Sequence, residues 1–384
     1  MGFELEPEQE ELRKTVRAFA EEVVAPRAEA MDREERLDEA VLDRMAAMGL
    51  FGLPFPEEYG GMGADYVTFC LAVEELARVD SSVALTLEAA VGLGAMPIYR
   101  YGTEEQRRRW LRPLATGEGI GAFGLTEPGG GSDAGSLRTR AHHDHDRDEW
   151  VINGTKAFIT NAGLPRSRLV TIAAVTGERA DGRGEISNLV VESGTPGYTV
   201  GRAYSKVGWH ASDTRELVFE DCRVPTGHLL GERGQGLANF LRTLDEGRIA
   251  IAALATGLAQ GCADECVKYA RERRAFGKPI AAFQAVAFKI ADMEAQAHVS
   301  RLAWRHAAAK LVAGQPFAKE AAIAKLHASE AAVACARDAV QVHGGYGFIN
   351  EFPVARFYRD AKVLEIGEGT SEVMRLLVAR SLGL

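Results

Sequence analysis

The feature that most constrains the fold of this chain of 384 residues is a change of hydrophobic pattern near residue 121 and again near residue 231. Residues 1 to 120 place apolar side chains at helical spacing, whereas residues 121 to 230 alternate β-favouring runs with glycine and proline. From residue 231 to 384 the helical spacing returns. Strands gathered in one block cannot alternate with helices, as a parallel doubly wound sheet requires. The sequence therefore predicts a mainly helical α+β protein with an N-terminal helical domain (1–120), a middle β-domain built as a barrel or sandwich (121–230) and a C-terminal helical bundle (231–384).

In the first block, four apolar residues follow one another at intervals of four, three and four: Leu12, Val16, Phe19 and Val23. This spacing forms one face of a helix. We expect the helix to begin near Pro7 and to end at Pro26, because proline suits a first turn and interrupts a helix interior. Further helices are predicted at residues 38–49, 66–79 and 83–100.

The middle block carries the strand signals. Asn153-Gly154 lies between two β-favouring runs, which predicts a hairpin turn. Three further strands are predicted in the stretches "LVTIAAV", "ISNLVVE" and "TRELVFEDCRV". The stretch "HHDHDRDE", residues 142–149, resembles a metal cluster, but it directly precedes a strand and is interpreted as a solvated turn. No metal site is expected.

The last block predicts three long, alanine-rich helices at residues 236–271, 283–312 and 317–343. Gly257 and Gly261 lie four residues apart on the first of them and allow another helix to pack closely. Cys262 and Cys266 lie on the same helix and are expected in the core.

Composition excludes some classes of protein. Lys and Arg number 45 and Asp and Glu number 54, so the net charge is −9 and a general nucleic-acid binder is not expected. Five scattered cysteines without a CxxC pair suit a reduced, cytoplasmic protein. The richest apolar stretch is taken to be Ile249 to Leu258, which is too short to cross a membrane.

Several stretches can carry chemistry. The glycine-rich loop "GLTEPGGGSDAGS", residues 124–136, can cradle a phosphate or lie along a flat ring, and the alternative is a simple connector. In "KAFITNAG", residues 156–163, Phe158 can stack on a planar cofactor and Thr160 can bind its edge. In "RERRAFGKPIAAFQ", residues 271–284, arginines beside an aromatic residue suit a diphosphate and an adenine, although arginines also form solvated helix faces. The glycines of "QVHGGYGF", residues 341–348, lack the preceding strand of a Rossmann fingerprint.

The last stretch is "LEIGEGTSEV", residues 364–373, which interrupts a helical region. Glu368 lies between Gly367 and Gly369, and glycines let a backbone turn tightly or approach a ligand. Glu368 is therefore a candidate catalytic carboxylate. The alternative is that it caps the helix beginning near Thr370.

In their order along the chain, these stretches resemble the signatures of the acyl-CoA dehydrogenase family: "LTEPGGGSD", "KAFITN", "RAFGKPIAAFQ", "QVHGGYGF" and "RDAKVLEIGEGTSEV". The resemblance covers nearly the whole chain. It implies a helical domain, a middle β-domain and a C-terminal four-helix bundle, assembled as a homotetramer made of two dimers. It also implies bound FAD.

The resemblance assigns positions to these ligands. The flavin would contact Phe123, Leu125, Thr126, Gly131, Ser132, Phe158, Ile159 and Thr160. The diphosphate and adenosine part would contact, across the dimer, Arg273, Phe276, Phe283, Gln284, Gln341, Gly344 and Gly345. Two further FAD contacts would be Thr370 and Glu372. The acyl-CoA thioester would contact Ser132, Asp245, Arg248 and Gly369.

In this family the catalytic base takes the α-proton of the thioester while the β-hydrogen leaves as hydride to flavin N5, and Glu368 matches the base. A backbone N–H of the base and a ribityl hydroxyl of FAD stabilise the developing enolate. Relatives that carry the base elsewhere place it at the position of Gly247, which has no side chain. Glu246 would face another direction.

The substrate remains open at this stage. Straight-chain relatives often have tyrosine before the base, and Gly367 in its place is expected to widen the pocket. Glu88 lies on a helix that closes the acyl cavity in relatives, and it is expected to be exposed because a buried charge without a partner is costly. The resemblance implies a trans-2-enoyl-CoA product and electron-transfer flavoprotein as the acceptor. The alternatives are a flavin oxidase or monooxygenase of the same fold, and a non-catalytic helical scaffold.

Overall fold

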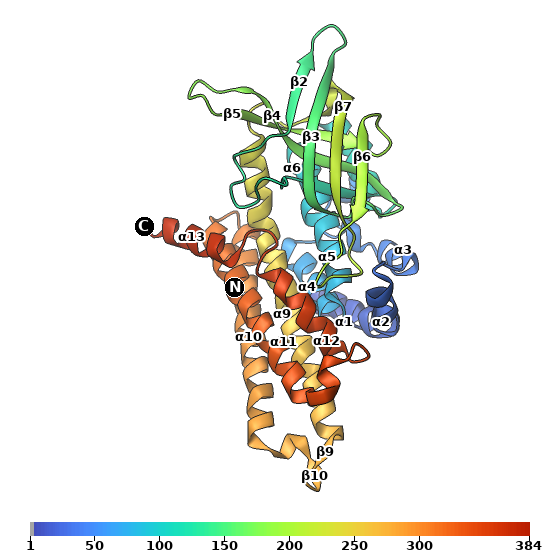
Figure 1. The fold of residues 1–384 in the computed structure, drawn as a ribbon, viewed down its shortest axis with the longest axis vertical. Helices are drawn as coiled ribbons and strands as arrows, with labels where there is room; N and C mark the ends of the chain where they lie inside the picture. Colours follow the sequence, from blue (N-terminus) through green and yellow to red (C-terminus); the bar gives the residue numbers. More distant parts are fainter. Residues whose placement is uncertain (1–3) are drawn as a thin grey trace.

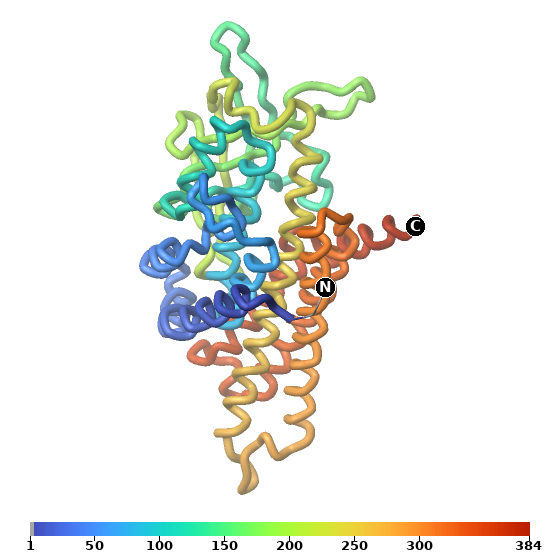
Figure 2. The backbone as a smooth tube through the Cα atoms, turned by 180° about the vertical axis from the view of Figure 1, so that it is seen from behind, coloured from blue at the N-terminus to red at the C-terminus, as the bar shows by residue number. Residues whose placement is uncertain are grey.

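The computed structural model describes residues 4–384, in which helices, one β-sheet and further helices follow in that order. The sheet lies at one end of an elongated molecule, and the helix α9 (Gly236–Glu272) runs from the sheet to the opposite end (Figure 1). The N-terminal helices lie along one side of α9 when the molecule is seen from behind (Figure 2). The long helix therefore connects all parts of the fold.

The N-terminal region contains the predicted helices. Val16 and Phe19 are buried, and Leu12 and Val23 pack partly buried against the same core, as the spacing predicts. The α-helices of this region are α1 (Pro7–Phe19), α2 (Ala25–Glu34), α3 (Glu39–Ala47), α4 (Tyr66–Ala77), α5 (Ser81–Glu88), α6 (Met96–Tyr101), α7 (Glu104–Gln106) and α8 (Arg112–Ala115).

The predicted end of the first helix at Pro26 is wrong. A π-helical segment, Ala20–Val24, joins α1 to α2, and the N–H of Ala25 donates to the carbonyl of Ala20 across this wider turn. Pro26 then occupies the first turn of α2, where its missing N–H is tolerated. The chain thus stays helical past the proline.

The middle region forms one eight-stranded sheet in the order β6-β7-β3-β2-β4-β5-β8, with β1 paired in parallel to β4. All three strands predicted from apolar runs are present, as β4, β5 and β7. The strands are β1 (Ile120–Gly124), β2 (Arg140–Asp144), β3 (Glu149–Thr160), β4 (Ser167–Glu178), β5 (Gly184–Glu192), β6 (Tyr198–Ala203), β7 (Thr214–Pro225) and β8 (Leu229–Leu230).

The hairpin predicted at Asn153-Gly154 is wrong, because β3 continues through both residues. The pairing of β3 with β7 shifts between Ile152 and Gly154, so the glycine marks a bulge. A Cβ on Gly154 would lie 2.6 Å from the Cα of Thr139, which explains the glycine. The turn lies instead at residues 145–148, within the stretch interpreted as a solvated turn.

The C-terminal region contains the three long helices close to the predicted bounds. These are α9, α10 (Gln284–Val312) and α11 (Ala318–His343), followed by α12 (Pro353–Leu364) and α13 (Ser371–Ser381). A small hairpin of β9 (Arg274–Ala275) and β10 (Lys278–Pro279) joins α9 to α10 at the end remote from the sheet (Figure 1). Cys262 and Cys266 are buried in the core, as expected.

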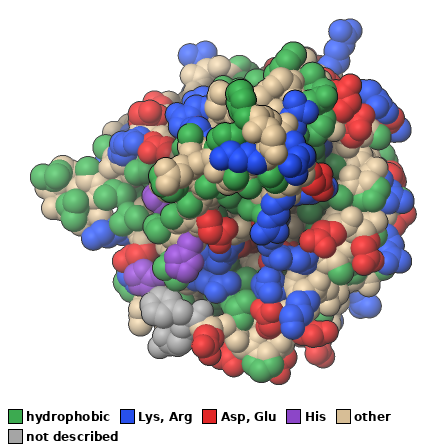
Figure 3. Space-filling view, turned by 90° about the horizontal axis from the view of Figure 1, so that it is seen from below, with side chains coloured by type: hydrophobic (Ala, Val, Ile, Leu, Met, Phe, Trp, Pro, Cys, Tyr) green, Lys and Arg blue, Asp and Glu red, His purple; other side chains and the backbone are tan. Residues whose placement is uncertain are grey.

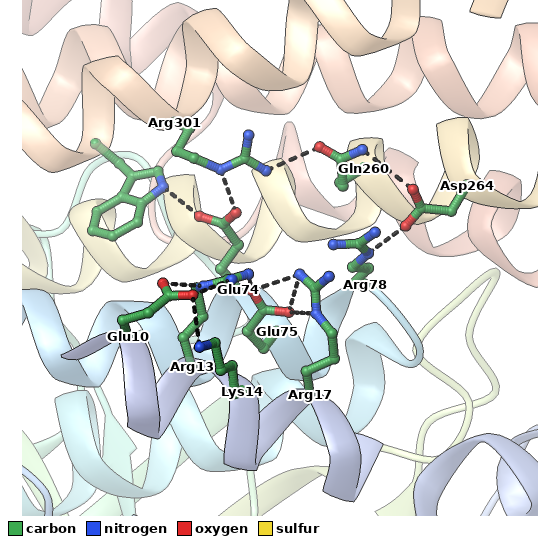
Figure 4. Close-up of polar contacts among 11 residues, drawn as sticks. Glu10, Arg13, Lys14, Arg17, Glu74, Glu75, Arg78, Gln260, Asp264 and Arg301 are labelled. Carbon is green, nitrogen blue, oxygen red and sulfur yellow. Dashed lines mark hydrogen bonds and ion pairs between the residues drawn. The ribbon is translucent and has the colours of Figure 1, made fainter. Parts of the chain in front are cut away.

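A polar network joins the N-terminal helices to the C-terminal bundle (Figure 4). Glu74 on α4 accepts hydrogen bonds from Arg301 Nε at 2.7 Å and from Trp304 Nε1 at 2.8 Å, both on α10. Its neighbour Glu75 accepts from Arg17 Nε of α1 at 2.7 Å. Because these carboxylates are buried and paired, they fix the position of α4 between α1 and α10.

Gly257 allows α4 and α9 to pack closely, as its spacing from Gly261 indicates. A Cβ at Gly257 would lie 2.1 Å from the backbone carbonyl oxygen of Glu74. We expect Gly257→Ala to lower the free energy of unfolding by about 1–3 kcal/mol, because the added methyl group would clash with backbone atoms of α4, which cannot move aside by changing rotamer. Gly227→Ala, with no atom within 4 Å of its Cβ, is the control and should keep the melting temperature of the parent. Equal melting temperatures for both variants would show that the helices can separate freely.

The segment from Ser81 to Tyr101 is long and apolar enough, by length and composition, to cross a membrane. The sequence reasoning considered only the shorter stretch Ile249 to Leu258 and missed this segment. Of the most apolar window in this segment, 94% is buried inside the protein, which is typical of a core helix. No other helix of the described residues meets the same criteria.

Candidate active site

The candidate base, Glu368, lies in the turn between α12 and α13. Its φ of 54° is unusual for a residue with a side chain, and Gly369 follows with a φ of 105°. The helix α13 is capped by Thr370, whose Oγ1 accepts the N–H of Val373 at 3.3 Å. The capping role considered for Glu368 thus belongs to Thr370.

The carboxyl group of Glu368 is sealed from solvent and faces Glu88 of α5. The expectation that Glu88 is exposed is wrong, since its side chain is fully buried. No hydrogen-bond donor of another residue type in the described chain reaches any of the four carboxyl oxygens. Burial raises the pKa of Glu368 to about 7. The neighbouring Glu88 and the charges of Arg248 and Lys325 act against burial and lower this pKa. Burial beside Glu368 raises the pKa of Glu88 well above its ordinary value, so Glu88 stays protonated to a higher pH than Glu368.

Two cations hold the backbone on the other side of the turn. Arg248 Nε of α9 donates to the carbonyl of Glu368 at 3.3 Å, and its Nη1 pairs with Asp245 at 2.5 Å. Lys325 Nζ of α11 donates to the carbonyl of Gly369 at 2.6 Å. The structure therefore brings together four residues predicted for the base and the substrate, namely Asp245, Arg248, Glu368 and Gly369.

Lys325 is a residue that the sequence reasoning missed. Its helix carries alanines on the buried face, including Ala321 and Ala328, and Lys325 occupies the position between them in this repeat. A lysine at a position where the helical period predicts an apolar side chain is the signal that could have identified it.

Gly247 and Glu246 behave as the sequence indicates. A Cβ on Gly247 would lie 2.3 Å from Glu368 Oε2, so the glycine leaves room for the carboxyl group. Glu246 is buried elsewhere, where it accepts from Arg100 Nη2 at 2.8 Å. Neither position of α9 thus supplies a carboxylate that could replace Glu368 as the base.

The space beside Gly367 is partly filled. Two ring carbons of Trp209 lie 3.8 Å and 3.9 Å from the place where a Cβ on Gly367 would be. The indole ring of Trp209 is buried, and the backbone N–H of Trp209 donates to Asp360 Oδ1 at 2.5 Å. Trp209 thus lies in van der Waals contact with the place that a side chain at position 367 would occupy.

The first group of predicted cofactor residues lies where β1 and β3 end. The carbonyl of Thr126 accepts the N–H of Ala157 at 2.9 Å, which holds the glycine-rich loop against β3. Below the loop, Lys156 Nζ pairs with Glu127 Oε1 at 2.7 Å, and both side chains are buried. Of the other predicted residues here, Phe123 stacks on Phe240, Leu125 and Ile159 are buried, Thr160 is half-buried, and Gly131 and Ser132 are exposed.

The second group lies at the opposite end of α9, near the β9–β10 hairpin (Figure 1). The guanidinium carbon of Arg273 lies 5.6 Å from the ring centre of Tyr346, so the stretches at 271–284 and 341–348 meet. Seen from below, Lys and Arg side chains lie beside hydrophobic ones at this end of the molecule (Figure 3). Most of the predicted residues here are exposed, with Phe283 half-buried: Arg273, Phe276, Phe283, Gln284, Gln341, Gly344 and Gly345. Within one chain, the two groups are thus well separated.

The exposed residues fit a flat, partly anionic cofactor. Phe158 is 64% exposed with a φ of 60°, and Phe276 is 94% exposed. Large aromatic side chains left in water at predicted contact positions are available to stack on a ring system. Thr370 and Glu372 lie at the first turn of α13, next to the candidate base.

A cavity of about 310 Å³ lies elsewhere, between α2, α9 and the start of α12. Charged side chains line it, among them Arg78, Asp264 and Arg356. None of the residues predicted for cofactor or substrate lines this cavity. The candidate active site is therefore the turn that carries Glu368.

Known protein families match most of the chain. Three family models match in the order of the chain: acyl-CoA dehydrogenase N-terminal domain at residues 6–118, middle domain at 122–222 and C-terminal domain at 234–383. The chain belongs to the acyl-CoA dehydrogenase family. It is an oxidoreductase with the acyl-CoA dehydrogenase fold, as the sequence predicts.

Individual members of the acyl-CoA dehydrogenase family are similar over their full length. A probable acyl-CoA dehydrogenase of Bacillus subtilis (strain 168) is 49% identical, with 100% of both chains covered. The structure of butyryl-CoA dehydrogenase from Megasphaera elsdenii has a TM-score of 0.96 and 42% identity, again with 100% of both chains covered. A chain from a structure described as the electron transferring flavoprotein of Acidaminococcus fermentans has a TM-score of 0.96 and 43% identity, covering 100% of this chain and 99% of that chain.

Proposed function

We propose that this chain is an FAD-dependent acyl-CoA dehydrogenase that converts a saturated acyl-CoA thioester into the trans-2-enoyl-CoA. The observation that carries the proposal is Glu368, a carboxyl group sealed from solvent whose pKa is raised to about 7. A base with a pKa close to the working pH is ionised often enough to act and is basic enough to take a weakly acidic proton.

The residues of the chain divide the work as follows. Glu368 takes the α-proton of the thioester. Its own N–H donates to no backbone carbonyl in the described residues and is free to stabilise the oxygen on which negative charge develops. Arg248 and Asp245 fix the turn from α9 and hold the backbone of the base in place.

FAD would supply the acceptor for the hydride that leaves Cβ. The loop at 124–136 and the end of β3, including Phe158, would hold its flavin ring. Its adenosine part would be held by the exposed end of a second copy, including Arg273 and Phe276. The separation of these two groups within one chain supports a dimer in which each copy completes the FAD site of the other, and a homotetramer of two such dimers is proposed.

The substrate proposed is a short acyl-CoA. The similarity to butyryl-CoA dehydrogenase supports this class. The buried Glu88 beside the base and the Trp209 ring beside Gly367 also support a short acyl chain, because they would limit the space for a longer one. A long alkyl chain packed against the Glu88 carboxyl group is unfavourable, because the chain offers that polar group no hydrogen bond. Electron-transfer flavoprotein is the proposed electron acceptor, and the cytoplasm is the proposed location.

The test is an anaerobic titration of the purified yellow protein with butyryl-, octanoyl-, palmitoyl- and isovaleryl-CoA, followed by flavin absorbance. We expect butyryl-CoA to bleach the flavin band at the lowest concentration. Bleaching by a long or branched thioester alone would reject the short-chain substrate but keep the reaction. A flavin band that no thioester bleaches would reject the dehydrogenase assignment.

A further inference from the structure

Lys325 has an environment that is unusual for a lysine. Its side chain is fully buried on α11, where its neighbours on the same face are alanines. No carboxylate of the described residues lies within the 4.0 Å of an ion pair, and the hydrogen bond of its Nζ goes to the backbone carbonyl of Gly369. Burying an ammonium group with only a carbonyl as its partner is costly. A lysine at this position therefore calls for an explanation.

The contact of Lys325 is at the turn that carries the base. Glu368 and Gly369 both have positive φ, a conformation in which a glutamate is strained. Each of these residues has its carbonyl held by a cation from a different helix, Arg248 from α9 and Lys325 from α11. The two hydrogen bonds therefore restrain the two peptide groups that follow the carboxylate.

We propose that Lys325 is a positioning residue, whose ammonium group holds the Gly369 carbonyl, keeps Glu368 in its strained conformation and favours its ionised form. This inference deepens the proposed function and rests on it for the role of Glu368 as base. The arrangement accounts for a lysine on a helix face that otherwise buries alanine.

The charges around the turn determine the direction of the effect. Glu368 faces Glu88 from α5, Arg248 from α9 and Lys325 from α11. Lys325 in turn faces Glu365 and Glu372, which flank the turn, as well as Glu368 and Arg248. Burial lowers the pKa of Lys325 to about 8, so its ammonium form prevails at pH 7. Because this charge lowers the pKa of Glu368, its removal must raise that pKa.

The experiment compares three variants with the parent. Lys325→Met removes the charge and the hydrogen bond at similar volume, and Lys325→Gln keeps a donor without the charge. Lys310→Met, which breaks an ion pair with Glu320 on the protein surface, is the control. The protonation of Glu368 is followed without substrate, as the pH titration of the infrared carboxyl band that disappears in Glu368→Gln. The band of Glu88 is assigned in the same way with Glu88→Gln.

We expect the Glu368 midpoint to rise in Lys325→Met and in Lys325→Gln, and to stay unchanged in Lys310→Met. In the reductive half-reaction with butyryl-CoA, the limiting rate at pH 7 should fall about tenfold or more in Lys325→Met, with a smaller change in KM. Lys325→Gln should recover part of this rate at high pH, because it can still hold the carbonyl.

An unchanged Glu368 midpoint in a folded Lys325 variant would overturn the proposal, because a merely structural lysine does not move that titration. If Lys325→Met does not fold, the titration of Lys325→Gln decides in the same way. A parent protein whose flavin no thioester bleaches would reject the proposed function, whereas the infrared titration would still decide whether Lys325 controls Glu368.

Discussion

Replacing Glu368 by glutamine is expected to lower the rate of flavin reduction by acyl-CoA by about 10⁴-fold, while FAD content and stability stay near those of the parent. Glutamine has nearly the same shape, but its amide cannot accept the α-proton. The carboxyl oxygens of Glu368 accept no hydrogen bond from the described residues, so the substitution breaks no ion pair. The measurement is stopped-flow bleaching of the flavin band under anaerobic conditions.

The pH dependence gives a second signature of Glu368. The carboxylate is the active form, so the rate of the parent should fall as the pH drops through about 7. The residual rate of Glu368→Gln should lack this limb. Glu330→Gln, which changes an exposed carboxylate on α11 paired with Arg375, is the matched control and should keep both rate and profile. A Glu368→Gln variant within tenfold of the parent would reject the assignment of the base.

The sequence predicts the larger elements because their signals are repeated many times. The α9 to α11 helices extend over 26 to 37 residues, and over such lengths the helical period is unambiguous. Single dipeptides are weaker. Asn153-Gly154 favours a hairpin locally, yet pairing along the whole of β3 outweighs this preference and leaves a bulge. Pro26 likewise does not end the helix, because the π-helical turn before it places the proline in the first turn of α2, where its missing N–H is tolerated.

The candidate site shows the same difference between local and distant information. Glu368 is predictable because its glycines adjoin it in sequence. The environment of Glu88 is not, since it depends on burial beside Glu368, which lies 280 positions away and raises the pKa of Glu88 further. Lys325 is also held from a distance, by a carbonyl of another segment. Pairings of this kind depend on which helices pack together, and a pattern within one helix does not contain that information.

Replacing Lys156 by methionine is expected to destabilise the protein by about 3 kcal/mol and to weaken FAD retention together. Lys156 is fully buried, and burial lowers its pKa to about 8, against the hydrogen bond and charge of Glu127. The substitution leaves the Glu127 carboxylate buried without its cation, although the N–H groups of Arg138 and Thr139 still donate to it at 2.6 Å and 2.9 Å. These remaining donors place the expected loss at the lower end of the range for a broken buried pair.

The reason that FAD retention should fall together with stability is the position of the pair. Glu127 follows Thr126 in the glycine-rich loop, and Lys156 also donates to the carbonyl of Leu125 at 3.3 Å, so the lysine fixes both sides of the predicted flavin contact. Denaturant unfolding gives the stability, and absorbance after gel filtration gives the FAD content. The double variant Glu127→Gln/Lys156→Met removes both charges and should recover a substantial part of the stability, because no uncompensated carboxylate remains. If the double variant is as unstable as Lys156→Met, packing of the lysine stem, and not the ion pair, holds the loop. If Lys156→Met loses stability but keeps full FAD content, the loop at 124–136 is not where the flavin binds.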